Sequence, residues 1–173
     1  MADPAALAGL ADDVRRVGRA AGLDAVGIAE ARPFDRARRA LAERKAAGLH
    51  GGMQFTYRNP DRATDPARTL PGARALVVGA RGYHRGRPVR PPAAGGPWAA
   101  VAEYSWRDQY AGLRRALGEV AGRLEEAGYR TRVLADDNAL VDREAAHRAG
   151  IGWFGKNANL LLPGLGSWFV LGS

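Results

Sequence analysis

The chain has no cysteine among its 173 residues. Disulfides, thiolate zinc sites, a cysteine nucleophile and any iron–sulfur cluster held by cysteines of this chain are therefore excluded. The three histidines, His50, His84 and His147, lie far apart and show no HExxH-type spacing, so the sequence predicts no transition-metal site held by its side chains. No apolar run approaches the roughly 20 residues that a membrane helix needs, and the first residues lack the order of a secretory signal. We therefore expect a cytoplasmic protein with no membrane partner.

Lysine is nearly absent as well, since Lys45 and Lys156 are the only two among 26 basic residues. The formal net charge is still +8, which favours a polyanionic partner because cationic side chains that neutralise phosphates release counterions. Arginine supplies almost all of this charge, and a GC-rich coding sequence has the same effect without any partner. Charge alone therefore leaves nucleic-acid binding open.

The composition is otherwise that of a globular protein, with 46% hydrophobic and 25% charged residues. The length suits a single domain, residues 1–173, with enough chain to bury a core. Apolar residues at helical spacing predict helices over residues 4–21 and 108–127, and a glycine follows each of them. Shorter helices are expected over residues 32–47 and 141–149.

Apolar runs between these helices predict strands over residues 24–29, 73–79 and 129–135. Two more strands are expected over residues 159–162 and 167–171, joined by a glycine-rich turn. Because helices and strands alternate along the chain, the predicted fold class is α/β (α+β).

Two segments stand apart from this alternation. Residues 85–97 hold four prolines and three glycines among arginines, which predicts a mobile loop and leaves a lid open as an interpretation. The last residues, 172–173, follow directly after a predicted strand, which suggests a fragment of a longer chain.

The segment from Gly150 to Gly155 satisfies the dinucleotide pattern GxGxxG. That pattern binds a pyrophosphate only after a strand and at the start of a helix, whereas here a helix is expected before it. The same residues nearly form a Walker A loop, but Asn157 stands where Mg²⁺ requires a Ser or Thr hydroxyl. Neither nucleotide site is expected. A glycine-rich turn still lets a ligand approach the backbone, with Lys156 and Asn157 as hydrogen-bond donors.

Two segments resemble epoxyqueuosine reductases: LADDNALVDREAAHRAGIGWFGKNANL, at residues 134–160, and GSWFVLG, at residues 166–172. In that family an aspartate, a short polar linker and an acidic–Arg pair precede AGxGWxGKN, and GSWxxLG comes later. Further family landmarks follow upstream in the same order: Gly52-Met53, Asp65-Pro66, Leu70 to Ala73, and Tyr104 to Trp106. The resemblance covers the whole chain and is more specific than either short motif.

The resemblance implies a reductase that converts epoxyqueuosine to queuosine in tRNA, with cobalamin and two [4Fe–4S] clusters as cofactors. It implies a nitroreductase-like mixed sheet flanked by helices, which forms the N-terminal cobalamin-binding domain. The clusters would belong to a C-terminal ferredoxin-like domain that begins where this sequence stops, so the missing cysteines fit a fragment that is inactive alone. The family also implies a tRNA partner carrying epoxyqueuosine, an electron donor such as a ferredoxin or flavodoxin, and a monomer.

Asp136 aligns with the proposed proton donor of the family. Opening an epoxide leaves an alkoxide, so an acid near that oxygen lowers the barrier. A carboxyl group of ordinary pKa is ionised at neutral pH, so we expect Asp136 to be removed from water. Two alternatives remain. Asp136 caps the helix expected near Val141, or Asp137 is the acid, because neighbouring residues of an extended chain face opposite ways.

The two glycine-rich turns, residues 150–157 and 164–167, are expected to line the corrin ring, since small residues admit a large flat group. The residues predicted to bind the cofactor are Arg58, Tyr104, Asp136, Lys156, Asn157, Leu160, Gly166 and Ser167. Plain packing is an alternative for Tyr104, and a solvated surface charge for Arg58. Three other aromatic residues are expected in the core: Trp153, Trp168 and Phe169.

The chain departs from the family pattern after Trp106. Many members carry Asp-Tyr-His there, whereas this chain has Asp108, Gln109, Tyr110 and Ala111, so no histidine role can be carried over. Two other classes of function remain open. A flavin-type oxidoreductase domain would bind FMN. A non-catalytic basic RNA-binding module would bind tRNA with steep salt dependence and bind no corrinoid, although no RRM or KH signature is present.

Overall fold

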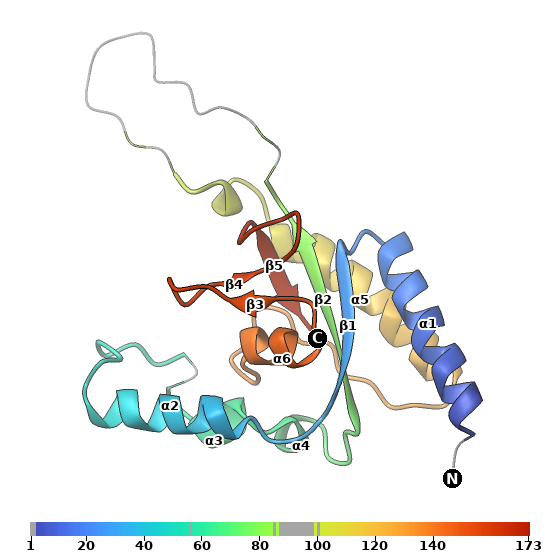
Figure 1. Ribbon diagram of the computed structural model, residues 1–173, viewed down its shortest axis with the longest axis horizontal. Helices are drawn as coiled ribbons and strands as arrows, with labels where there is room; N and C mark the ends of the chain where they lie inside the picture. Colours follow the sequence, from blue (N-terminus) through green and yellow to red (C-terminus); the bar gives the residue numbers. More distant parts are fainter. Residues whose placement is uncertain (1–2, 56, 85, 87–98, 100) are drawn as a thin grey trace, which may run out of the picture.

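The fold is an antiparallel sheet covered by helices on both faces, in a computed structural model that describes residues 3–55, 57–84, 86, 99 and 101–173 (Figure 1). Helices α1 and α5 pack on one face of the sheet and α6 on the other. The elements in chain order are α1 (Pro4–Ala20), β1 (Ala25–Glu30), α2 (Asp35–Ala46), α3 (Pro60–Ala63), α4 (Pro66–Thr69), β2 (Ala75–Gly82), the 3₁₀ turn η1 (Glu103–Ser105), α5 (Gln109–Glu126), α6 (Asp142–Arg148), β3 (Trp153–Phe154), β4 (Leu160–Leu161) and β5 (Phe169–Gly172). The predicted α/β (α+β) class is confirmed.

The main sheet has the strand order β1-β2-β5, and both of its pairings are antiparallel. Ala25 lies opposite Ala80, and Gly79 lies opposite Gly172. The second sheet described, β3 with β4, is also antiparallel. The expectation of a mixed sheet is therefore wrong for the described strands. The reason is that the excursion from β1 through α2, α3 and α4 returns to the same end of the sheet, so β2 runs back along β1.

Each face of the sheet carries its own hydrophobic cluster. The cluster under α1 and α5 contains Val14, Leu23, Val26, Leu113, Ala116, Leu117, Val120 and Val170. The cluster under α6 contains Phe34, Val78, Ala80, Leu134, Ala139, Leu140, Ala145, Ala146, Leu160, Leu162 and Leu171. Both helices on the first face begin at an aspartate cap: the carboxylate of Asp3 accepts the backbone N–H of Ala5, and that of Asp108 accepts the N–H of Ala111.

The strand expected over residues 129–135 is wrong for most of its length, because only Ala135 pairs, in an isolated bridge to Gly172. The two strands expected at 159–162 and 167–171 exist, but they do not form a hairpin with each other. Strand β4 pairs with β3, a two-residue strand that the sequence did not reveal, and β5 pairs with β2. The proline-rich loop expected at residues 85–97 lies outside the described residues except for Gly86.

None of the helices in the described ranges is both long enough and apolar enough to cross a membrane. The glycine-rich segment from Gly150 follows α6 and leads into β3, so the strand-to-helix setting of a nucleotide-binding loop is missing there.

Candidate functional site

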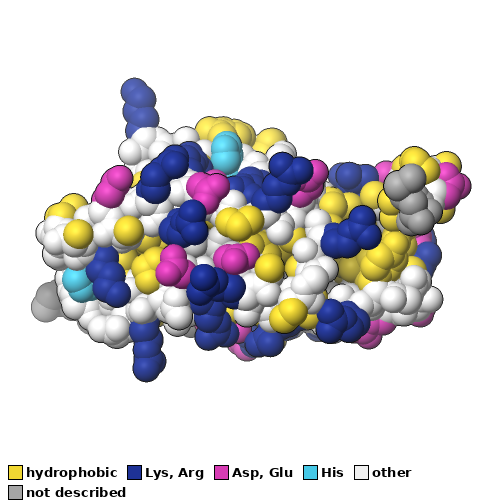
Figure 2. All heavy atoms as spheres, turned by 90° about the horizontal axis from the view of Figure 1, so that it is seen from below, with side chains coloured by type: hydrophobic (Ala, Val, Ile, Leu, Met, Phe, Trp, Pro, Cys, Tyr) yellow, Lys and Arg dark blue, Asp and Glu magenta, His cyan; other side chains and the backbone are white. Residues whose placement is uncertain are grey.

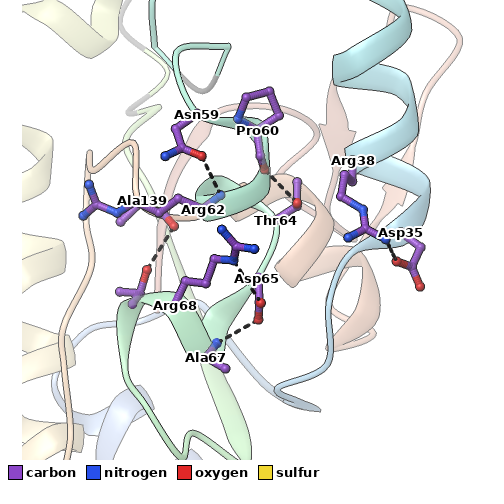
Figure 3. Close-up of polar contacts among 11 residues, drawn as sticks. Asp35, Arg38, Asn59, Pro60, Arg62, Thr64, Asp65, Ala67, Arg68 and Ala139 are labelled. Atoms are coloured by element: carbon purple, nitrogen blue, oxygen red, sulfur yellow. Dashed lines mark hydrogen bonds and ion pairs between the residues drawn. The ribbon is translucent and has the colours of Figure 1, made fainter.

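Residues 136–142, here called the acidic loop, connect the sheet to α6. Its start is held by Leu134 and Ser173, whose backbones exchange hydrogen bonds of 2.6 and 2.9 Å. Its far end is held by α3 and α4. The N–H of Val141 donates to the carbonyl oxygen of Ala63 at 2.9 Å. The hydroxyl of Thr69 donates to the carbonyl oxygen of Ala139 at 3.3 Å, and Figure 3 draws this contact at Ala139. The loop is therefore anchored at both ends, with Asp136 and Asp137 between the anchors.

Asp136 adopts a left-handed backbone conformation with φ of 58° and leaves its side chain exposed. Residues other than glycine adopt this conformation at a cost, and such strain gathers at functional loops. The expectation that Asp136 is removed from water is wrong for this conformation of the loop. The left-handed turn comes directly after the last bridge to the sheet, at Ala135, so no neighbouring strand covers the carboxylate.

The local hydrogen bonds bear on the two alternatives to an acid role for Asp136. The N-cap of α6 is Val141, and no side chain caps this helix, so Asp136 is not its cap. Asp137 accepts the backbone N–H of Ala139 at 2.8 Å and so closes a tight turn within the loop. Asp137 therefore has a structural task, whereas no hydrogen bond is recorded for the Asp136 carboxylate in the described part of the chain.

Asp142 is a carboxyl group that sequence reasoning did not single out. Its pKa is raised from 3.8 to about 8, by burial first and then by the carboxylates of Asp137 and Asp136. At neutral pH this shift favours the protonated form of Asp142, at the end of the loop that carries Asp136. The only sequence signal was its place in the acidic–Arg pair of the family pattern, with Arg143.

Tyr110 connects the acidic loop to an aromatic cluster. Its pKa is raised by burial first, then by the carboxylates of Asp136 and Asp142, and then by the phenols of Tyr104 and Tyr83. Tyr110 belongs to the first turn of α5, in the segment where the chain departs from the family pattern. Tyr110 therefore lies within the electrostatic reach of the acidic loop and of Tyr104 in η1.

The aromatic cluster consists of Tyr83, His84, Tyr104 and Trp168. The ring centroid of Trp168 lies 4.7 Å from that of His84 and 6.1 Å from that of Tyr83, which lies 6.5 Å from Tyr104. Tyr104 and Trp168 remain 54% and 46% exposed, so the cluster presents aromatic faces to a ligand. The turn with Gly166 and Ser167 directly precedes Trp168, which joins the cluster through its contacts with Tyr83 and His84.

Two aromatic residues expected in the core lie at the surface instead. Trp153 is 50% exposed and Trp168 is 46% exposed. Trp153 begins the two-residue strand β3, and Trp168 directly precedes β5. At both positions the side chain is left without a covering layer. Phe169 is partly buried and packs against the cluster under α6, as expected.

The other predicted cofactor residues are spread more widely. Lys156 and Asn157 lie exposed in the turn between β3 and β4, where the Asn157 side-chain oxygen accepts the N–H of Asn159 at 3.1 Å. Leu160 is 2% exposed, so a cofactor could meet it only through its backbone. Arg58 is exposed before α3, and no hydrogen bond or ion pair joins it to the acidic loop within the described ranges. Among those same residues, no group of His, Asp and Glu side chains is placed to hold a metal ion.

No protein-family profile matches the chain. The chain is similar to curated epoxyqueuosine reductases. The enzyme of Gloeobacter violaceus is 33% identical to it, over 96% of this chain and 51% of the relative. The enzyme of Burkholderia pseudomallei is 32% identical, over 98% of this chain and 46% of the relative. The chain thus spans about half the length of the curated relatives it matches.

Solved structures give the same result. A selenomethionine-labelled epoxyqueuosine reductase superposes with a TM-score of 0.81 at 27% identity, over 95% of this chain and 44% of that one. An epoxyqueuosine reductase with an epoxyqueuosine-modified tRNA stem loop gives 0.78 at 25% identity over the same shares. A Bacillus subtilis epoxyqueuosine reductase whose catalytic aspartate loop is swung out of the active site gives 0.76 at 25%, again over 95% and 44%.

The fold and site define an α+β domain with an antiparallel sheet, an exposed acidic loop that follows the bridge from Ala135 to Gly172, and a glycine turn that leads into β5 beside exposed aromatic side chains. In both sequence and fold the chain is related to the epoxyqueuosine reductases, and the resemblance inferred from its motifs is confirmed.

Proposed function

We propose that this chain is the cobalamin-binding part of an epoxyqueuosine reductase and presents Asp136 to the epoxide of epoxyqueuosine in tRNA. The observation that carries this proposal is the exposed aromatic cluster that directly follows the turn at Gly166 and Ser167, in a fold that holds Asp136 in an exposed left-handed turn after the sheet. The names of its relatives, and the modified tRNA stem loop in one of their structures, support the same substrate for this chain.

The surface residues fit a large flat cofactor. Tyr104 and Trp168 offer half-exposed aromatic faces, and the glycine turn at Gly166 has no side chain to obstruct a ring. Lys156 and Asn157 can donate hydrogen bonds to the amide groups at the edge of a corrin. When bound, cobalamin would supply the electrons that break the epoxide C–O bond, replenished through two [4Fe–4S] clusters outside this chain and a donor such as a ferredoxin or flavodoxin.

The task of the protein in this reaction is to deliver a proton. Breaking the first C–O bond leaves an alkoxide, and the Asp136 carboxyl would donate a proton to that oxygen. General acid catalysis of this kind raises the rate by about 10²–10⁴-fold. Here Asp136 is exposed, and in the Bacillus subtilis relative the catalytic aspartate loop is swung out of the active site. We infer that the acidic loop closes over the substrate, because desolvation favours the protonated form of a carboxyl group.

The acid role is tested by Asp136→Asn, since asparagine tolerates the left-handed backbone and keeps the shape of the side chain. The chain would be loaded with cobalamin that has been reduced chemically, and an epoxyqueuosine-containing stem loop would be added as substrate. The rate of a single turnover would then be measured. We expect a rate loss of about 10²–10⁴-fold with unchanged cobalamin affinity. The matched control is Asp137→Asn, which keeps the oxygen that accepts from Ala139. Equal rates for the two variants would refute the acid role.

Cofactor identity is tested separately by titrating the chain with cobalamin and with FMN, followed by visible absorbance. We expect saturable cobalamin binding that weakens about tenfold or more in Trp168→Ala, because one aromatic face of the site is lost. The control is Tyr129→Ala, an exposed aromatic residue beyond the end of α5. Binding of FMN alone would replace this proposal with the flavin-type reading. Salt-sensitive binding of tRNA without any corrinoid would favour the RNA-binding module.

A further inference from the structure

The hairpin that carries Lys156 and Asn157 stands apart from the main sheet (Figure 1). Its strands, β3 and β4, pair only with each other in the described structure. Strand β4 is anchored in the core through Leu160, which is 2% exposed. Strand β3 has two residues, and the one that faces inward is Phe154, which is partly buried against the cluster under α6. The orientation of the hairpin therefore depends on the contacts that hold Phe154.

Side chains from two helices contact the ring of Phe154. The guanidinium carbon of Arg36, from α2, lies 4.9 Å from the ring centroid. The imidazole centroid of His147, from α6, lies 5.3 Å from it, and the Nδ1 atom of this histidine lies 3.3 Å from the carbonyl oxygen of Gly152. A guanidinium over an aromatic face is attracted by the negative charge of that face. Strand β3 is therefore linked to both α2 and α6.

A buried carboxylate holds Arg36 in turn. The Nη2 atom of Arg36 donates to Oε2 of Glu144 at 2.6 Å, and the side chain of Glu144 is 8% exposed. The other oxygen of this carboxylate lies 4.0 Å from Nε of Arg148. Because a buried carboxylate requires charged hydrogen-bond partners, it fixes the direction of the Arg36 guanidinium. A planar guanidinium can offer its edge to a carboxylate and its face to an aromatic ring at the same time.

We propose that Arg36 is a positioning residue, which fixes the β3–β4 hairpin and thereby the two donors Lys156 and Asn157. This inference rests on the proposed function, which assigns these two donors to cobalamin. In the described chain no residue of α2 is itself buried, so this helix does not support the hairpin through a packed core. The series of contacts from Glu144 through Arg36 to Phe154 supports it instead, by charge and by the face of the ring.

The tip of the hairpin is held together by its own hydrogen bonds. The N–H of Gly155 donates to the carbonyl oxygen of Asn159 at 2.8 Å, and the N–H of Asn159 donates to the side-chain oxygen of Asn157 at 3.1 Å. These bonds fix the shape of the turn but not its direction relative to the sheet. A shift of Phe154 therefore displaces Lys156 and Asn157 together. Binding of a rigid ligand that must meet both donors weakens as a result.

The first test compares Arg36→Gln with the control Arg38→Gln by hydrogen exchange. Glutamine keeps a hydrogen-bond donor but lacks the charge that the ring of Phe154 attracts. Arg38 lies on the same helix and pairs within it, with Asp35 at 2.8 Å. We expect exchange at the amides of residues 153–161 to become about fivefold faster or more in Arg36→Gln and to stay unchanged in Arg38→Gln. Equal exchange in the two variants would overturn the proposal.

Titration with cobalamin, followed by visible absorbance, tests the consequence for the site. We expect the dissociation constant to rise about fivefold in Arg36→Gln, to recover in part in Arg36→Lys, and to stay unchanged in Arg38→Gln. Unchanged affinity in Arg36→Gln, for a parent chain that binds cobalamin, would refute the positioning role. A parent chain that binds no cobalamin would refute the proposed function instead, and the exchange comparison would still decide whether Arg36 holds the hairpin.

A double variant separates positioning from general stability. Phe154→Leu removes the ring, keeps an apolar side chain and leaves the pair of Arg36 with Glu144 in place. If Arg36 acts through the ring, adding Arg36→Gln to Phe154→Leu should change exchange and cobalamin affinity by less than about twofold further. An additional loss as large as that of Arg36→Gln alone would show that Arg36 acts through another contact, and the inference would fail.

Discussion

Asp142 shows at the scale of a single residue how burial sets a protonation state. Its folded pKa is raised from 3.8 to about 8, chiefly by burial, with Asp137 and Asp136 adding to the shift. Between these two values the unfolded chain has released a proton that the folded chain still holds. The free energy of unfolding therefore falls as the pH rises through this window, at up to about 1.4 kcal/mol per pH unit.

We predict that Asp142→Asn stabilises the protein at pH 8 by a few kcal/mol and has little effect near pH 4. Asparagine has the shape of the protonated acid but does not ionise, so the dependence of stability on pH is removed. Urea denaturation at a series of pH values measures the effect. The control is Asp61→Asn, an exposed carboxylate on α3. If the Asp142→Asn profile keeps the slope of the parent protein, Asp142 is not the buried acid inferred here.

The contrast between Asp136 and Asp142 shows what the sequence could reveal. Asp136 was identified because it stands at a fixed place in a family pattern, and the structure puts it in a strained, exposed turn. The raised pKa of Asp142 depends on burial and on two neighbouring carboxylates, and no spacing in the sequence reports burial at a helix N-terminus. Leu160 illustrates the reverse case, since a motif position turned out to be a core side chain.

At the scale of elements, the helices were the most predictable parts. The apolar stripes and the following glycines placed α1 and α5 within about two residues of their observed ends, and Gly22 and Gly128 adopt positive φ there. Strands were harder because their existence depends on a partner. Residues 129–135 have a strand-like composition but find only one bridge, and β3 exists only because β4 folds back on it.

Strand β1 and the end of α6 touch backbone to backbone at Gly27. A Cβ there would lie 2.4 Å from the carbonyl oxygen of Ala149 and 2.6 Å from a methyl group of Ile151. We predict that Gly27→Ala destabilises the protein by about 3 kcal/mol, because backbone atoms cannot move aside as a flexible side chain can.

The matched control for Gly27→Ala is Gly118→Ala on α5, where an added Cβ meets nothing within 4 Å. Because alanine is the better helix former, this change should stabilise the protein by about 0.5–1 kcal/mol. Thermal melts of both variants measure the difference. Similar shifts for the two variants would mean that β1 and α6 are not in close contact at Gly27.

At the scale of the whole molecule, the charge can be followed on the face drawn in Figure 2. There Lys and Arg side chains alternate with acidic and hydrophobic ones, so the positive charge of this face is distributed rather than gathered. Several arginines are engaged in ion pairs, for example Arg38 with Asp35 and Arg114 with Asp108. The net charge of +8 therefore does not by itself outline a nucleic-acid surface.

Some of these arginines hold the layers together. Arg148 of α6 donates to the carbonyl oxygens of Arg32 and Pro33 at 2.9 and 2.7 Å, and its guanidinium lies 4.5 Å from the ring centroid of Phe34. On the same helix the buried carboxylate of Glu144 pairs with Arg36 of α2 at 2.6 Å. The chain entering α2 is thereby fixed to α6, the helix that follows the acidic loop.

We predict that Arg148→Ala lowers the free energy of unfolding by about 2–3 kcal/mol, because two charge-assisted hydrogen bonds and a cation–π contact are lost together. Arg148→Lys should recover only part of this, since an ammonium group cannot reproduce the planar fork of donors. The control, Arg143→Ala, removes an exposed arginine of the same helix and should cost about 0.5 kcal/mol or less. Among the described residues, the one hydrogen bond of the Arg143 side chain is that to the carbonyl oxygen of Ala158, at 3.5 Å. Urea denaturation with an unchanged m-value measures all three. Equal losses for Arg148→Ala and Arg143→Ala would show that the Arg148 contacts do not help to fix the chain entering α2 to α6.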